Sequence, residues 1–456
     1  MTQQPHNTQP GQDLHILPRA LSPAVPALAG GLLVVAAFLL SRGSADGVRR
    51  FWLAYVQAFA FVLSLSLGAM FFVLIQHLTR AGWSVVVRRP AEILAANFGV
   101  LIVAFLPIAG TVAGGSGLLY RWARPVQETH EAHAAVRPLL PAARAADPGH
   151  PPQPGGQAAG VHGHGHDDDA AGGLDALTLK KRAWLNGPFF LARWVVYLAV
   201  WAVCGWFLLA TSTAQDASGD PDLTLRLQYP SGAMTLLFGL TVTFAAFDLL
   251  MSLDAHWFST IFGVYYFAGS VVGFLAVLIL SLMLLQRLGL LRRSVTVEHY
   301  HDLGKLLFAF VFFWGYIAFS QYMLIWYGNL PEETAWFARR GASTVEPSGW
   351  SAVALALLLG HFVLPFAGLL SRHAKRSRVW LGGMAAWLLV MHWLDLYWLV
   401  MPEAPAAGWP PGLAEIGCTA GLTGLFAAGV LRLTSGRSLL ALRDPRLPES
   451  LAFHNP

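Results

Sequence analysis

The chain has 456 residues, of which 55% are hydrophobic and only 12% are charged. Soluble domains carry about 25% charged residues, so this composition excludes an ordinary pair or trio of soluble domains. The formal net charge of +5 does not indicate a nucleic-acid-binding protein, because the basic residues stand in short runs between apolar blocks. Length, composition and charge together predict an integral membrane protein.

Ten apolar segments follow one another along the chain, and each has the length of about 20 residues that a helix needs to cross a bilayer. We therefore predict an all-α integral membrane protein with about ten transmembrane helices. The expected helices are 22–41, 52–78, 92–114, 187–211, 231–252, 257–287, 303–329, 350–371, 378–401 and 412–433.

The basic residues divide unevenly between the two sides of the predicted membrane. Most lie in the two terminal tails and in the loops that follow helices 2, 4, 6 and 8, all on one side of the membrane. The loop between helices 2 and 3, for example, contains Arg80, Arg88 and Arg89. Because short cytoplasmic loops are enriched in Lys and Arg, both termini are predicted to be cytoplasmic. The predicted organisation is a cytoplasmic tail (1–21), helices 1–3 (22–114), a periplasmic loop (115–186), helices 4–10 (187–433) and a second cytoplasmic tail (434–456).

The long predicted loop, 115–186, is rich in His, Gly, Ala and Pro and poor in large apolar residues, so we expect it to be flexible. Its His162, His164 and His166 are separated by glycines, which fix no coordination geometry, so no metal site is assigned there. The two cysteines, Cys204 and Cys418, lie in apolar segments without the spacing of an iron–sulfur or c-type haem motif.

Polar side chains within the predicted helices gather toward the outer face of the membrane. A charge deep in the bilayer costs about 2.5–3.5 kcal/mol on insertion scales, so each one needs a partner or a function. No catalytic residue is assigned. The candidates for a proton path or for quinone contacts are Arg193, Asp248, Asp254, His256, Gln321, His361, His392 and Asp395.

Each candidate has a structural interpretation beside the functional one. His392 and Asp395 are three residues apart on one helix face, which suits a proton relay, a contact to quinol or a structural pair. Asp248 and Arg193 favour a buried ion pair over a proton-path carboxylate. His361 favours a hydrogen-bonded histidine in the bundle; a haem between His361 and His392 is the less favoured alternative.

A short repeat suggests how the helices group. The Asp-Leu pair at Asp248 ends helix 5, and the Asp-Leu pair at Asp395 lies near the end of helix 9. This predicts two four-helix bundles, helices 2–5 and helices 6–9, with helices 1 and 10 flanking them.

Three stretches carry a resemblance to a known family. They are WLNGPFF (184–190), MSLDAHWFSTIFGVYYFAG (251–269) and FWGYIAFSQYMLIWYGNLPEET (313–334). They resemble the NrfD/polysulfide-reductase-like membrane subunits of bacterial alternative complex III, and are most similar to its ActF-type subunit, quinone-binding subunit 2. The Gly-rich segment 106–122 departs from the family, so no quinone contact is assigned to it.

The resemblance implies a subunit of a quinol:cytochrome c oxidoreductase in the bacterial inner membrane, with no redox centre of its own. Its implied partners are a larger NrfD-like sister subunit, an iron–sulfur protein, multihaem cytochrome c subunits, a terminal oxidase and membrane lipids. It implies no covalently bound cofactor; quinone or quinol (menaquinone or ubiquinone) and phospholipids are the expected ligands.

The implied function is support of quinol oxidation, proton transfer coupled to electron delivery to cytochrome c or an oxidase, or both. The alternatives are a secondary transporter or ion-translocating channel, and a structural membrane anchor without a quinol site.

Overall fold

The computed structural model describes residue 16 and residues 22–124, 176–342, 349–404 and 408–455. In this part of the chain the regular structure is helical, apart from an isolated antiparallel bridge between Ile16 and Ser438. Ten helical segments are long and apolar enough to cross a membrane. The prediction of an all-α integral membrane protein with about ten transmembrane helices is therefore confirmed.

Several of the ten spanning segments consist of more than one helix. They are α1 (Ala24–Ser41), α2 (Ala45–Leu78), α3 (Val85–Ala95) with α4 (Phe98–Ala113), α6 (Gly187–Ser218), α7 (Asp222–Leu249) with the turn η5 (Met251–Leu253), α8 (Phe262–Arg287), α9 (Val297–Gly328), α11 (Ser351–Leu357) with η6 (Leu358–Val363) and α12 (Leu364–Leu370), α14 (Arg378–Val400) with η7 (Met401–Glu403), and α15 (Leu413–Thr434).

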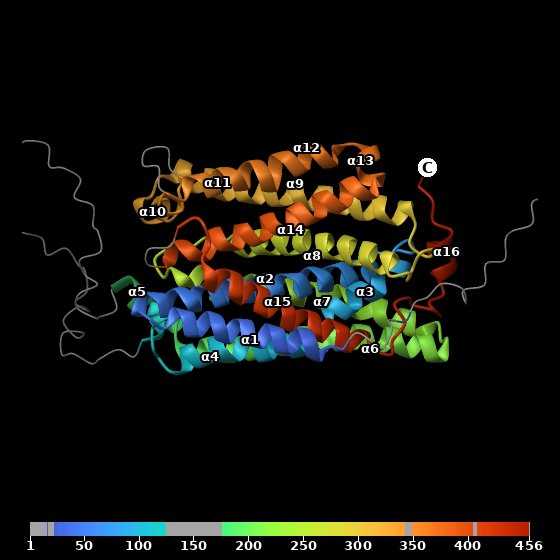
Figure 1. Cartoon of the computed structure of the whole chain (residues 1–456), viewed down its shortest axis with the longest axis horizontal. Helices are drawn as coiled ribbons and strands as arrows, with labels where there is room; N and C mark the ends of the chain where they lie inside the picture. Colours follow the sequence, from blue (N-terminus) through green and yellow to red (C-terminus); the bar gives the residue numbers. More distant parts are fainter. Residues whose placement is uncertain (1–15, 17–21, 125–175, 343–348, 405–407, 456) are drawn as a thin grey trace, which may run out of the picture.

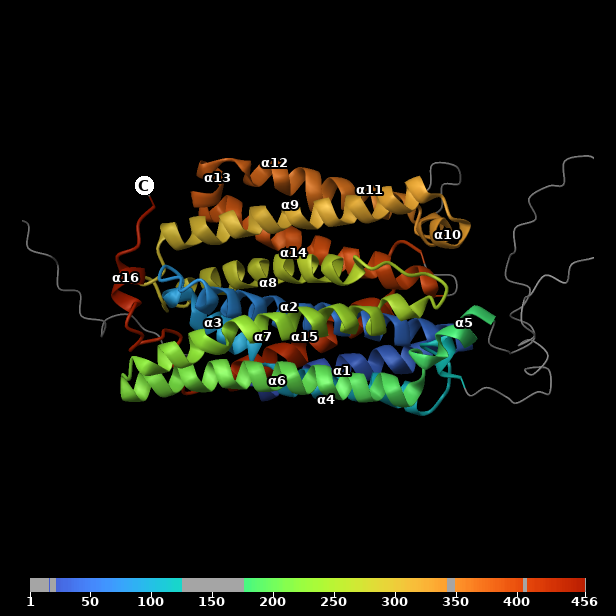
Figure 2. The ribbon, with the colours of Figure 1, turned by 180° about the vertical axis from the view of Figure 1, so that it is seen from behind.

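The spanning helices run side by side along the long axis of the molecule (Figures 1 and 2). At one end lie the short helices α5 (Ala176–Lys180) and α10 (Pro331–Arg339), and we call this the loop end. At the other lies α16 (Leu447–Leu451) in the C-terminal tail, and we call this the tail end. The assignment of the tail end to the cytoplasm stays a prediction.

Two rings of four spans form the body of the protein, as expected from the repeat. The first ring contains α2, α3–α4, α6 and α7, and the second contains α8, α9, α11–α12 and α14. Helix α2 joins them, because it packs against α8 and α14 of the second ring as well as against its own neighbours. Nearly every side chain of α2 between Phe51 and His77 is consequently buried.

Helices α1 and α15 form a close pair outside the two rings. Glycines make the approach close: a Cβ atom on Gly30 would lie 2.5 Å from the carbonyl oxygen of Gly421, and one on Gly424 would lie 3.0 Å from that of Pro26. Small residues allow this backbone contact between membrane helices, where packing replaces the hydrophobic effect. Helix α15 also packs on α2, so it anchors the pair to the body.

The tail-end boundaries of four spans differ from the sequence prediction. The third span begins at Val85 rather than 92, and the fourth ends at Ser218 rather than 211. The fifth begins at Asp222 rather than 231, and the seventh at Val297 rather than 303. Arg88 and Arg89 therefore lie inside α3, and assigning them to a cytoplasmic loop was wrong. Their charges are paired with buried carboxylates, which allows the helix to start earlier than its apolar stretch does.

The described parts of the predicted flexible loop pack on the loop end. The Tyr120 hydroxyl donates to the carbonyl of Leu249 at 2.9 Å, and the Trp122 indole N–H donates to that of Ser252 at 2.9 Å. The rest of that loop, including His162, His164 and His166, lies outside the described residues, as does the N-terminal tail apart from residue 16.

Candidate functional site

The eight predicted residues fall into separate groups in the loop-end half of the molecule. Arg193 and Asp248 meet between α6 and α7, and Asp254 and His256 lie in the connection before α8. Gln321 of α9 accepts a hydrogen bond of 3.0 Å from the Ser259 hydroxyl and ties α9 to the same connection. His361, His392 and Asp395 lie in the second ring and form a third group.

Asp248 is fully buried and fully hydrogen-bonded. Arg193 reaches its two carboxylate oxygens with Nε and Nη2, each at 2.7 Å. The Tyr197 hydroxyl adds a bond of 3.1 Å and the Trp184 indole one of 3.0 Å. The Arg193 guanidinium also stacks 4.1 Å from the centre of the Trp184 ring. A carboxylate with four donors and a bidentate counter-charge is a structural junction, as the ion-pair interpretation predicted.

Asp254 lies at the loop-end surface in a cluster of charges. It pairs with Arg339 and accepts a bond of 2.9 Å from the backbone N–H of His256, whose side chain is exposed. Burial acts to raise the pKa of Asp254, but the bonds from His256 and the charge of Arg339 outweigh it and hold that pKa below its usual range.

Arg340 is the buried member of this surface cluster. Its guanidinium bonds to Glu403 at 2.9 Å and to the carbonyl of Leu399 at 2.8 Å, and it stacks 3.6 Å from the centre of the Trp336 ring. Burial lowers the pKa of Arg340 to about 10, partly offset by Glu403, so it stays charged at neutral pH. These contacts fix α10 onto the end of α14.

Asp395 of α14 has a different environment from Asp248, although the sequence repeat pairs them. Its oxygens accept a short hydrogen bond from the Tyr265 hydroxyl of α8 and one of 3.3 Å from the Trp314 indole of α9. Both donors are neutral, and no described cation pairs with Asp395. An ionised Asp395 is therefore a buried charge without a counter-charge, whereas a protonated one is not.

His392 lies one turn before Asp395 and reaches across to α2. Its Nε2 atom is 2.8 Å from the Ser64 hydroxyl oxygen, and that hydroxyl donates its single proton to the carbonyl of Phe61 at 2.6 Å. With the Ser64 proton donated to Phe61, Nε2 carries the proton in this bond and Nδ1 of the neutral ring is an acceptor. Nδ1 is buried and has no hydrogen-bond partner among the described residues.

Two glycines on α8 create the space for His392. A Cβ atom on Gly273 would lie 2.6 Å from Cδ2 of the His392 ring, and one on Gly269 would lie 3.2 Å from its Nδ1. The glycines are four residues apart and hence on one face of α8. Because neither glycine has a side chain, the imidazole of His392 fits against α8 and reaches Ser64 of α2.

His361 lies in a π-helical turn in the middle of its span. The turn, η6, ends two residues before Pro365, which lacks the N–H that would bond to the His361 carbonyl in a regular helix. The imidazole is fully buried, and its ring centre is 3.9 Å from that of Trp314. Neither ring nitrogen has a hydrogen-bond partner among the described residues.

Asp395 thus bonds to Tyr265 and Trp314, His361 packs on Trp314, and His392 and Trp314 both lie beside Gly269. We call His361, His392, Asp395, Trp314 and Tyr265 the histidine–carboxylate cluster. The structure shows no hydrogen bond between His392 and Asp395, so they are not the directly bonded pair that their spacing allows. Both histidines have buried ring nitrogens without a hydrogen-bond partner among the described residues, and Asp395 has neutral donors but no counter-charge. Such imidazoles can accept a proton or bind a polar group, and such a carboxylate can take up a proton.

Sequence reasoning did not select Ser64, Tyr265 and Trp314 of this site. Tyr265 and Trp314 lie within the two longest stretches that carry the family resemblance, which was the available signal. Ser64 had no signal, because a serine in a long apolar helix most often bonds to its own backbone, and this one does so as well.

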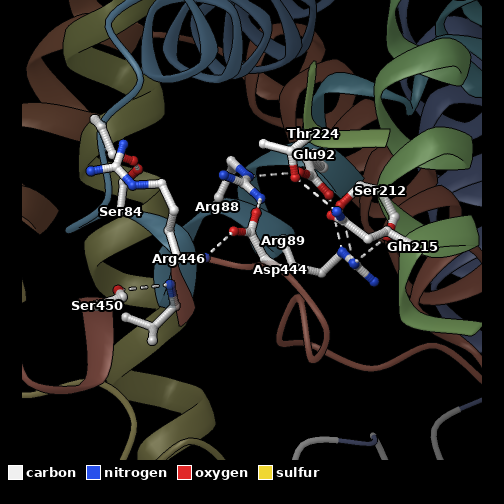
Figure 3. A network of polar contacts seen from close by, with 12 residues as sticks. Ser84, Arg88, Arg89, Glu92, Ser212, Gln215, Thr224, Asp444, Arg446 and Ser450 are labelled. Carbon is white, nitrogen blue, oxygen red and sulfur yellow. Dashed lines mark hydrogen bonds and ion pairs between the residues drawn. The ribbon is translucent and has the colours of Figure 1, made fainter. Parts of the chain in front are cut away.

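Sequence reasoning selected no polar residue in the tail-end half. A buried network there joins α3, α6 and the C-terminal tail (Figure 3). Arg88 pairs with Glu92 at 3.1 Å and with Asp444, and Arg89 pairs with Glu92 at 3.0 Å and with Asp216 at 2.7 Å. The spacing of the two arginines from Glu92, three and four residues, was the signal that could have revealed it.

No protein-family model matches the chain, and no curated protein matches it.

Proposed function

We propose that the chain is a membrane subunit of a quinol-oxidising respiratory complex, in which the histidine–carboxylate cluster accepts and passes on protons. The observation that carries the proposal is the cluster's chemistry: His392 presents a free acceptor nitrogen, and Asp395 has only neutral donors. Oxidation of a quinol yields a quinone, two electrons and two protons, so a complex that performs it needs buried groups that exchange protons.

The rest of the proposal draws on the resemblance of 184–190, 251–269 and 313–334 to ActF-type subunits. Two of these stretches contribute Tyr265 and Trp314 to the cluster, so the resemblance and the buried site coincide. In this proposal the redox centres belong to an iron–sulfur protein and multihaem cytochrome c subunits beside a larger NrfD-like sister, with cytochrome c or an oxidase as acceptor. The membrane is the bacterial inner membrane.

Asp248 has no part in proton transfer in this proposal. Its two oxygens are taken up by the bidentate bond to Arg193, and Trp184 and Tyr197 donate to them as well. The two halves of the repeat therefore differ. In the first ring Asp248 joins two helices through Arg193, whereas in the second ring Asp395 has no counter-charge among the described residues.

The first experiment tests the assembly. The chain, tagged at its C-terminus and purified in mild detergent from native membranes, is expected to carry haem absorbance, iron and quinol oxidation activity. A chain that purifies alone, and that moves a solute when reconstituted in vesicles, would instead establish the transporter alternative.

The second experiment tests the cluster in the assembled complex. Asp395→Asn and His392→Gln are each expected to lower quinol:acceptor turnover at least tenfold and to increase its solvent isotope effect, with subunit content unchanged. Glu415→Gln is the matched control, since Glu415 is a fully buried carboxylate that pairs with Arg50 at 2.6 Å outside the cluster. Unchanged turnover and proton release in both cluster variants would leave only the structural anchor.

A further inference from the structure

An open cavity at the tail end is lined by three arginines. It has a volume of about 520 Å³ and lies between the end of α8 and the start of α14, with Arg287, Arg292 and Arg378 as its charged residues and Met283 and Val379 among the others. Volumes of 300–1,000 Å³ are typical of sites for small ligands. This cavity is remote from the histidine–carboxylate cluster, which lies in the loop-end half.

The three arginines have no acidic partner in the described part of the chain. Arg292 Nε donates to the carbonyl of Gln286 at 3.1 Å, and the Arg378 guanidinium stacks 5.4 Å from the centre of the Tyr300 ring. By contrast, Arg376, close by on the same end, pairs with Glu298. Three unpaired guanidinium groups around one cavity repel one another, so the site favours an anion.

The floor of the cavity is rigid. The Gln286 side chain donates to the carbonyls of Leu291 and Val295 at 3.2 and 2.7 Å, and it accepts from the Tyr300 hydroxyl at 3.0 Å. Leu291 is fully buried with φ of 53°, an uncommon conformation for a residue with a branched side chain. The turn before Arg292 is thus held in a strained conformation that presents this arginine to the cavity.

The position of the cavity indicates which anion it binds. Arg287 is the last residue of one spanning helix and Arg378 is the first of another, so the cavity lies where the apolar part of the bundle ends. Large apolar side chains beside it are exposed, including Leu284, Leu288, Val379 and Trp380. Arginines at a helix end next to exposed apolar surface match the phosphate and acyl chains of a phospholipid, and basic pockets between spanning helices bind such headgroups.

We propose that this cavity is a binding site for the phosphodiester headgroup of an anionic phospholipid, with Arg287, Arg292 and Arg378 holding the phosphate and the exposed side chains contacting the acyl chains. The phosphate of a free anion has the same chemistry, but it would leave the adjoining apolar surface without a function. The proposal does not depend on the proposed function.

The test uses the purified full-length chain in a neutral detergent and measures its thermal unfolding midpoint. Addition of phosphatidylglycerol or of a diphosphatidylglycerol is expected to raise the midpoint, whereas phosphatidylcholine is not. In the variant R287Q/R378Q the lipid concentration needed for half of this effect is expected to rise about thirtyfold, because each of the two basic residues near an anionic headgroup contributes roughly fivefold.

The matched control is R226Q/R432Q. It removes the same charge from two exposed arginines of α7 and α15 that are at the tail end but do not line the cavity. R287K/R378K changes the same two residues but retains their charge, so it is expected to bind lipid. Binding by this variant would show that R287Q/R378Q loses the effect through its lost charge and not through a damaged fold. Native mass spectrometry of the same samples, which counts bound lipids, gives a second readout.

Four results would overturn the proposal. One is the absence of any preference of the native chain for anionic lipid. Another is equal loss of the effect in the control variant. The third is full stabilisation by millimolar inorganic phosphate in the absence of lipid, which would assign the site to a free anion. The fourth is binding of an acidic protein segment in place of lipid, which would assign the site to a partner subunit.

Discussion

Arg193 holds Asp248 through two parallel hydrogen bonds of 2.7 Å, and both side chains are buried between α6 and α7. Removing one partner leaves the other as an uncompensated buried charge, which typically costs about 3–5 kcal/mol. Replacing both with apolar residues removes the charge altogether. The pair therefore fixes how two neighbouring spans meet.

We predict that Arg193→Met lowers the free energy of unfolding by about 3–5 kcal/mol and that adding Asp248→Leu restores a large part of the loss. Denaturant unfolding in mild detergent, followed by tryptophan fluorescence, measures both. The control is Arg226→Met on an exposed position of α7, with an expected change below about 0.5 kcal/mol. A single variant as stable as the control would show that the pair has no structural role.

Gly273→Ala should displace His392. The new methyl group would lie 2.6 Å from the ring, closer than real side chains approach, so the imidazole must move. Overpacking of this kind destabilises by about 1–3 kcal/mol, and we expect turnover of the complex to fall as it does in His392→Gln. Gly239→Ala on α7, where the added methyl group meets nothing within 4 Å, is the control and should be stabilising or neutral.

The double variant Gly273→Ala/His392→Ala distinguishes the cause. If the clash with His392 explains the loss of stability, the effects of the two substitutions will be strongly non-additive, because the smaller side chain removes the clash. Additive effects would mean that Gly273 matters for another reason.

Asp444→Asn should loosen the C-terminal tail. Asp444 is buried, pairs with Arg88 and accepts the backbone N–H of Arg446 at 2.8 Å, so its charge joins the tail to α3 (Figure 3). We expect faster cleavage of the tail by trypsin in limited proteolysis, by about tenfold or more. Glu449→Gln affects an exposed ion pair with Arg446 and should leave the cleavage rate nearly unchanged.

The stability of the loop end should depend on pH through Asp254. Its pKa is lower in the folded protein than in the unfolded chain, so its contribution is present above the unfolded pKa, near 4, and is lost as the pH falls through the folded value. Thermal midpoints of the native chain should therefore decrease below about pH 4 more steeply than those of Asp254→Asn. Parallel curves for the two proteins would exclude this contribution.

The ten spans could be predicted from sequence because each is an apolar block of the right length, and hydropathy measures that directly. The tail-end boundaries could not, because Arg88, Arg89 and Glu92 count as polar one by one and become compatible with the interior only as a group. Likewise, the spacing of His392 and Asp395 identified two site residues. It could not show that each bonds to another helix, since Ser64 and Tyr265 lie far away in sequence.

The two aspartates of the repeat show the same limit. Sequence similarity places Asp248 and Asp395 at matching positions, and both are buried. Their difference depends on whether an arginine reaches them from a neighbouring span, and Arg193 has no counterpart beside Asp395 in the described structure. Which residue of a neighbouring helix contacts each aspartate can be read only from the folded structure.

The burial of α2 also has a consequence for synthesis of the protein. This helix is made before α7, α8, α14 and α15, against which it packs. Its surface therefore stays in contact with lipid, or with the insertion machinery, until those spans have been made. The core is complete only once α15 has been inserted, and a chain truncated before residue 413 exposes one side of its own centre.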